Sequence, residues 1–71
     1  MKKKYFFTYE GEETPESIKA LEAIKDDAGV KILLEDGYFL LVLSRQSVVN
    51  RLKKEIGDDW NIIPVEDLDL L

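Results

Sequence analysis

The chain has 71 residues, of which 45% are hydrophobic and 35% are charged, and its formal net charge is −5 at pH 7. This composition is typical of one small globular domain, and no apolar run approaches the roughly 20 residues that a membrane span needs. The chain has no cysteine and no histidine, which excludes disulfides, thiol catalysis, the usual zinc ligands and the usual general base.

The chain begins with three lysines and a short aromatic run. Lys2, Lys3 and Lys4 precede an apolar stretch of only Tyr5 to Phe7, which is too short for a secretion signal, so we expect a cytoplasmic protein. Residues 4–9 are aromatic and β-prone and predict the first strand. Thr14, Pro15 and Glu16 then form a typical helix start. Apolar residues recur at helical spacing up to Gly29, which we expect to cap the helix.

The second half of the chain predicts a hairpin, a helix and a last strand. Residues 30–34 and 38–43 are β-rich and flank Asp36-Gly37, a dipeptide typical of two-residue hairpin turns. Ser44 is a suitable cap for a second helix, which should end at Gly57. Residues 60–65 predict a fourth strand, where Pro64 requires an edge position. We expect one domain over residues 1–65, followed by a short tail over residues 66–71.

The order βαββαβ is typical of the ferredoxin-like α+β fold. In that fold a four-stranded antiparallel sheet, ordered 4-1-3-2, carries two helices on one face. The end of the first strand, the central hairpin turn and the start of the fourth strand should then meet at one end of the molecule. Seven carboxylates are expected there: Glu10, Glu12, Glu13, Glu35, Asp36, Asp58 and Asp59.

The predicted turn also sets which side chains share a face of the sheet. A loop at Asp36-Gly37 pairs Leu34 with Phe39, Ile32 with Leu41 and Val30 with Leu43, and this apolar set is expected under the helices. The first strand would add either Tyr5, Phe7 and Tyr9 or Phe6 and Thr8 to the uncovered face. A core this small is marginal alone, so we predict a homodimer through a half-apolar open face that includes Leu33, Tyr38, Leu40 and Val42.

One stretch resembles a known family. The sequence from Tyr5 to Glu10, Tyr-Phe-Phe-Thr-Tyr-Glu, followed by Thr14-Pro15-Glu16, is similar to the start of the Cas2 and VapD-like family of small CRISPR- and toxin-related proteins. The resemblance implies a ferredoxin-like homodimer joined through its sheets. It also implies, for some members, a metal-dependent nuclease that uses an aspartate at the end of the first strand. Glu10 stands at that position here.

The acidic end could hold a cation by its own chemistry. Mg²⁺ prefers hard oxygen ligands and keeps several waters, so Glu10 with Asp58 and Asp59 would be a sufficient set. A metal-bound hydroxide could then hydrolyse a phosphodiester, with Glu10 as the catalytic candidate. The negative net charge disfavours nucleic acid, and the compensating basic surface is predicted on the second helix, at Arg45, Arg51, Lys53 and Lys54.

The favoured interpretation is a small acidic homodimeric interaction module that is not an enzyme and needs no cofactor. It would bind a protein or protein–nucleic acid partner through its sheet face or through its acidic end. Three alternatives stay open. They are a Mg²⁺-dependent nuclease, an acidic inhibitor that binds a basic nucleic-acid enzyme, and an RNA binder that stacks bases on Tyr5 and Tyr38, although Leu40 stands where a second stacking aromatic belongs.

Overall fold

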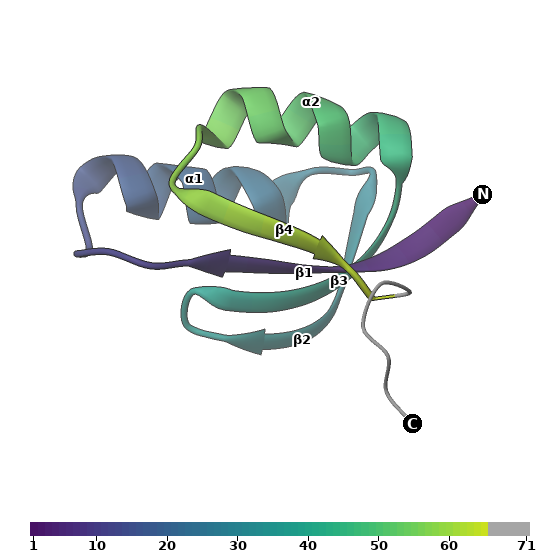
Figure 1. Cartoon of the computed structure of the whole chain (residues 1–71), viewed down its shortest axis with the longest axis horizontal. Coiled ribbons are helices and arrows are strands. Elements are labelled where there is room, and N and C mark those ends of the chain that lie inside the picture. The colour runs from purple at the N-terminus through teal and green to yellow at the C-terminus, as the bar shows by residue number, and fades with distance from the viewer. Residues whose placement is uncertain (66–71) are drawn as a thin grey trace.

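The computed structural model of the chain describes residues 1–65; the predicted tail, residues 66–71, lies outside this range. The described part forms four strands and two helices (Figure 1), which are β1 (Lys2–Tyr9), α1 (Pro15–Asp26), β2 (Val30–Asp36), β3 (Phe39–Arg45), α2 (Gln46–Ile56) and β4 (Trp60–Pro64). No helix within residues 1–65 is long and apolar enough to span a membrane.

The strands form one antiparallel sheet in the order β2-β3-β1-β4. This is the predicted order read from the other edge, and it places β4, with Pro64, at an edge as expected. Both helices lie on the same side of the sheet (Figure 1). The architecture is therefore α+β with two layers, an arrangement compatible with the ferredoxin-like fold.

Helix α1 begins as predicted but ends differently. The hydroxyl of Thr14 accepts the Ser17 N–H at 3.0 Å, and the Ser17 hydroxyl accepts the Thr14 N–H at 2.8 Å, so the cap is reciprocal. The C-cap is Asp27, and the expected cap at Gly29 is wrong. A Cβ on Gly29 would lie 2.8 Å from Val48 Cγ2. Glycine is needed there because α2 passes close to the backbone.

Helix α2 ends at Gly57 as predicted, with a φ of 84° at that residue. The expected cap at Ser44 is wrong, because the helix is preceded by Arg45, whose side chain makes no capping bond. Ser44 lies within β3 with its side chain fully buried, and its hydroxyl donates to the Gly29 carbonyl at 2.8 Å. A serine before a helix therefore serves here as a buried strand residue.

The β2–β3 hairpin turns one residue later than predicted. Asp36 pairs with Phe39, so the two loop residues are Gly37 and Tyr38. Gly37 has a φ of 59° and no other residue type has a positive φ within residues 1–65, and glycine at the first central position is typical of a type II′ turn. A β-bulge between Ile32 and Leu34 shifts the register again. The predicted pairing is therefore wrong.

The shifted hairpin reverses the expected faces of β3. Leu40 and Val42, predicted on an exposed interface, are fully buried beneath the helices. They belong to one core with residues of β1, both helices and β4, which comprises Tyr5, Phe7, Ile24, Leu40, Val42, Val49, Leu52 and Trp60. Of the set expected in the core, Leu34, Phe39, Leu41 and Leu43 point away from the helices, and Leu34 and Phe39 are exposed. Val30 and Ile32, on the other side of the bulge, pack against the core as expected.

Candidate functional site: an open sheet face between two charged rows

The sheet face without helices is here called the open face. Neighbouring residues of a strand point to opposite faces, so the burial of Tyr5, Phe7, Leu40 and Val42 under the helices assigns their neighbours to the open side. Directly paired residues on adjacent strands share a face. The open face therefore comprises Lys4, Phe6 and Thr8 of β1, Lys31, Leu34 and Asp36 of β2, Phe39, Leu41 and Leu43 of β3, and Asn61 and Ile63 of β4.

Cross-strand pairing orders these side chains into three rows that run across the strands. The basic row contains Lys31, Leu43 and Lys4. The apolar row contains Leu34, Leu41, Phe6 and Ile63. The acidic row contains Asp36, Phe39, Thr8 and Asn61. The open face thus has an apolar centre, with positive charge on one side and negative charge on the other.

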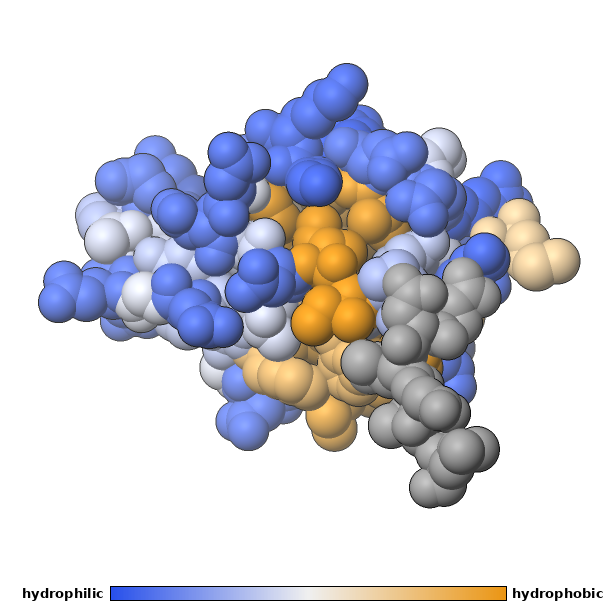
Figure 2. Space-filling model, viewed as in Figure 1, coloured by the Kyte–Doolittle hydropathy of each residue, from blue (hydrophilic) through white to orange (hydrophobic). Residues whose placement is uncertain are grey.

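The apolar part of this face is accessible. Leu34 is 52% exposed, Phe39 38% and Ile63 37%, and the rings of Phe6 and Phe39 contact each other with centroids 5.1 Å apart. In Figure 2, hydrophobic atoms extend to the lower side of the molecule, which is the side of the sheet opposite the helices in Figure 1. Contiguous apolar surface of this kind is typical of an interaction site.

Some polar side chains of the strands lie on the covered face, which is the sheet face under the helices. Ser44 is buried there through its bond to Gly29, and the Glu35 carboxylate lies 2.6 Å from Lys25 of α1. Strand β3 turns Phe39, Leu41 and Leu43 outward. An antiparallel sheet with one solvated face normally shows polar residues on that face, so the outward Phe39, Leu41 and Leu43 make this open face more apolar than is usual.

The acidic loops do share one end of the molecule, as predicted. Tyr9 at the end of β1 pairs with Trp60 at the start of β4, and the hairpin turn lies at the same end (Figure 1). The predicted metal ligands Glu10, Asp58 and Asp59 are not gathered into a three-ligand group, because residues 1–65 contain no group of three or more His, Cys, Asp or Glu side chains that could hold a metal ion. A cavity at this end, lined in part by Asp59 and Trp60, measures about 50 Å³. Small-molecule sites are usually about 300 Å³ or larger.

Three aromatic side chains pack against one another at the acidic end. Tyr9, Tyr38 and Trp60 have ring centroids 5.2 to 6.0 Å apart. The Tyr38 hydroxyl donates to Glu13 at 2.9 Å and lies 3.2 Å from the Ser17 hydroxyl. The bond with Ser17 lowers the Tyr38 pKa, but desolvation and the Glu13 carboxylate outweigh it and raise the pKa overall. Tyr38, predicted at the interface, therefore ties the hairpin turn to the start of α1.

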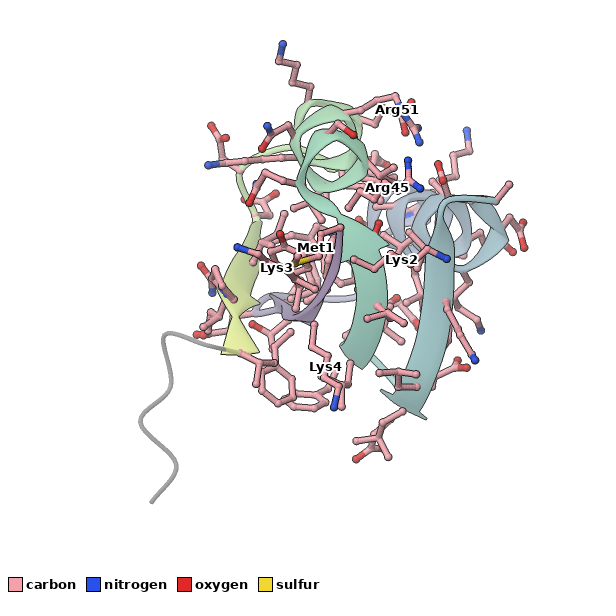
Figure 3. The ribbon with its side chains drawn as sticks, turned by 90° about the vertical axis from the view of Figure 1, so that its right-hand side faces the viewer. Met1, Lys2, Lys3, Lys4, Arg45 and Arg51 are labelled. Atoms are coloured by element: carbon pink, nitrogen blue, oxygen red, sulfur yellow. The ribbon has the colours of Figure 1, made fainter. Side chains whose placement is uncertain are left out.

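The basic side chains are divided between two places. Arg45 pairs with Lys2 across the sheet, and Figure 3 shows both near the amino terminus, with Lys4 pointing away from the helices. Arg51 lies 2.7 Å from Asp27 and 3.6 Å from Glu55, so its charge is compensated. Lys53 and Lys54 line a shallow hollow at the other end of α2. The predicted basic surface of Arg45, Arg51, Lys53 and Lys54 is therefore not one continuous patch.

Comparisons of the chain with protein-family models, curated proteins and solved structures found no match. The resemblance of the first strand to the Cas2 and VapD-like family thus stays a prediction.

Proposed function

We propose that this chain is a small interaction module that forms a homodimer through its open face and leaves its acidic end accessible to a basic protein partner. The observation that carries the proposal is the outward apolar row of Leu34, Leu41, Phe6 and Ile63, continued by Phe39. The Cas2 and VapD-like resemblance supports the same interpretation.

The hydrophobic effect supplies the driving force. Burial of apolar surface contributes about 25 cal/mol per Å², and the exposed parts of Leu34, Phe39 and Ile63 lie on the open face. Four strands spaced about 4.8 Å apart and about six residues long give a face roughly 20 Å square, on the order of 400 Å² per protomer. Two such faces give roughly 800 Å² in total, which is below the roughly 1,200 Å² of stable specific interfaces and falls among weak, transient contacts. The dimer should therefore be reversible and dependent on concentration.

The acidic end suits a second contact. Two loops meet at one end, away from the apolar row, and carry Glu10, Glu12, Glu13, Asp58 and Asp59. Tyr38 and Trp60 hold this end through packing and through the hydrogen bond to Glu13. Charged surfaces of one sign accelerate and select partners of the opposite sign, so a basic protein is the expected class of partner.

Sedimentation velocity over concentrations from about 5 μM to 1 mM tests the homodimer. The 8.2 kDa chain should shift toward twice its mass as concentration rises. Leu34→Glu should keep the protein monomeric, because a carboxylate would enter the apolar row. The matched control is Ile18→Glu, which replaces a 41% exposed residue of α1, and this variant should dimerise like the parent protein. A parent protein that stays monomeric throughout, or a control that behaves like Leu34→Glu, would overturn the proposal.

A further inference from the structure

We infer that the two copies pack face to face with their strands antiparallel, so that Lys31 of each protomer lies opposite Asp36 of the other. This inference rests on the proposed homodimer and adds the orientation of its subunits. The observation behind it is the order of the three rows, in which positive charge and negative charge lie on opposite sides of the apolar row.

Two identical faces whose strands are aligned, as in most packed sheets, can be related by symmetry in two ways. The two-fold axis of a closed dimer must lie in the plane between the sheets, and it can run along the strands or across them. An axis along the strands places the basic row of one copy on the basic row of the other and reverses the strand order, so that two Lys4 and two Lys31 side chains are gathered into one row. Juxtaposed like charges oppose association. An axis across the strands avoids this repulsion.

The second orientation also produces attraction. When the axis follows the apolar row, Leu34, Leu41, Phe6 and Ile63 each meet their own counterpart, and the basic row of one copy covers the acidic row of the other. Position along the row is unchanged by this rotation, so β2 lies over the partner's β2. Lys31 and Asp36 are on β2 on either side of Leu34. Each Lys31 therefore faces the partner's Asp36, and the pair occurs twice.

Both side chains are available for such a contact. Lys31 and Asp36 are exposed, and within residues 1–65 neither forms an ion pair. Because β2 is an edge strand, the two pairs would lie at the rim of the interface, where charge fixes orientation more than affinity. Aligned sheets pack at about 30° to each other, and the flexible lysine side chain can follow this rotation.

Charge reversal gives a direct test by sedimentation equilibrium. Lys31→Asp and Asp36→Lys should each weaken self-association roughly tenfold, because two attractive pairs become repulsive. The double variant Lys31→Asp/Asp36→Lys should return to the parent affinity. An equimolar mixture of the two single variants should form heterodimers more tightly than either variant self-associates, since both pairs are then attractive. These differences should shrink at about 1 M salt.

Two controls separate the alternatives. Lys53→Asp changes the net charge like Lys31→Asp but lies on α2, so it should leave the affinity within about twofold of the parent. Ile63→Glu lies on β4, at the sheet edge opposite β2, and should weaken a face-to-face dimer. If the charge variants respond as expected but Ile63→Glu has no effect, the copies join through their β2 edges and the inference fails.

The orientation and the dimer itself can fail separately. A parent protein that is monomeric at every concentration overturns the proposed homodimer. A dimer that is weakened by Leu34→Glu, but whose two single charge variants show no preference for each other in a mixture, keeps the homodimer and overturns the antiparallel orientation.

Discussion

The hydroxyl of Ser44 donates a hydrogen bond to the carbonyl of Gly29 at 2.8 Å, and the serine side chain is fully buried. The bond joins β3 to the loop that leads into β2. It places a polar residue on the covered face of the sheet and leaves Leu43, the preceding residue of β3, on the open face. The most apolar side of the strand is thus directed outward.

Ser44→Ala should destabilise the protein by about 1 kcal/mol, because the partly buried Gly29 carbonyl loses its donor. The midpoint and slope of urea unfolding, followed by circular dichroism, measure the change. Ser47→Ala removes an exposed hydroxyl in the first turn of α2 and should change stability by less than about 0.5 kcal/mol. Equal stability of Ser44→Ala and the parent protein would show that the bond contributes nothing.

Gly29→Ala should destabilise the protein by about 1 to 3 kcal/mol through overpacking. The added Cβ would lie 2.8 Å from Val48 Cγ2 and 3.1 Å from Val48 Cγ1. The double variant Gly29→Ala/Val48→Ala should be less destabilised than the sum of the two single changes, because removing the valine methyl groups opens the space. Strictly additive unfolding free energies would contradict this steric explanation.

Leu40→Glu should unfold the protein, whereas Leu34→Glu should leave it folded. Leu40 is 0% exposed in the core and Leu34 is 52% exposed on the open face. An unpaired carboxylate in the core costs several kcal/mol, and a small domain has little stability to lose. Far-ultraviolet circular dichroism and a thermal melt distinguish the two variants. A cooperative melt of Leu40→Glu near the parent temperature would contradict the observed register.

Asp27 should make the stability depend on acidic pH. Desolvation raises the pKa of Asp27, but the Gly29 N–H bond and the Arg51 guanidinium outweigh it and lower the pKa overall. A lowered folded pKa means that the contribution is fully present above the unfolded pKa, near 3.9, and is lost as the pH falls through the folded value. Asp27→Asn should therefore be less stable than the parent by about 0.5 to 1 kcal/mol at pH 7, and the difference should shrink below about pH 4.

Urea unfolding of both proteins at pH 7 and at low pH measures this difference. Glu55→Gln is the control, because Glu55 contacts Arg51 at 3.6 Å and both side chains are about half exposed. Its effect on stability should be close to zero at both pH values. A difference between Asp27→Asn and the parent that does not vary with pH would contradict an ionic contribution.

Local signals in the sequence predicted most of the architecture. Thr14 and Pro15 marked the start of α1, Gly57 marked the end of α2, and Pro64 placed β4 at an edge. These residues act through their own backbone preferences or through neighbours a few positions away. Their effect can therefore be inferred without knowledge of the tertiary contacts.

The register of the hairpin could not be inferred in the same way. Asp36-Gly37 and Gly37-Tyr38 are both acceptable turn dipeptides, and they differ only in whether glycine stands second or first in the loop. The expectation that the more apolar set lies inside favoured the wrong choice. Ser44 and Glu35 can lie on the covered face because Gly29 and Lys25 satisfy them. These partners come from other elements, so no local pattern reveals them.

The candidate site was predicted only in part, because its residues depend on the hairpin register and on contacts between distant elements. Chain topology brought the acidic loops to one end, as expected, but within residues 1–65 it did not bring three carboxylates within reach of one cation. An uncovered, partly apolar sheet face was also expected. Its membership depended on the register. Among the four predicted interface residues, Leu33 is 39% exposed at the bulge, Tyr38 is half-buried, and Leu40 and Val42 are fully buried.

The bulge beside Leu33 limits how far this protein can assemble. It interrupts the regular hydrogen-bonding edge of β2, while Pro64 removes a donor from the opposite edge on β4. Edges of this kind are poor templates for adding further strands. Growth of the sheet into a fibre is thereby discouraged at both of its edges. An assembly that uses the open face alone stops at two copies.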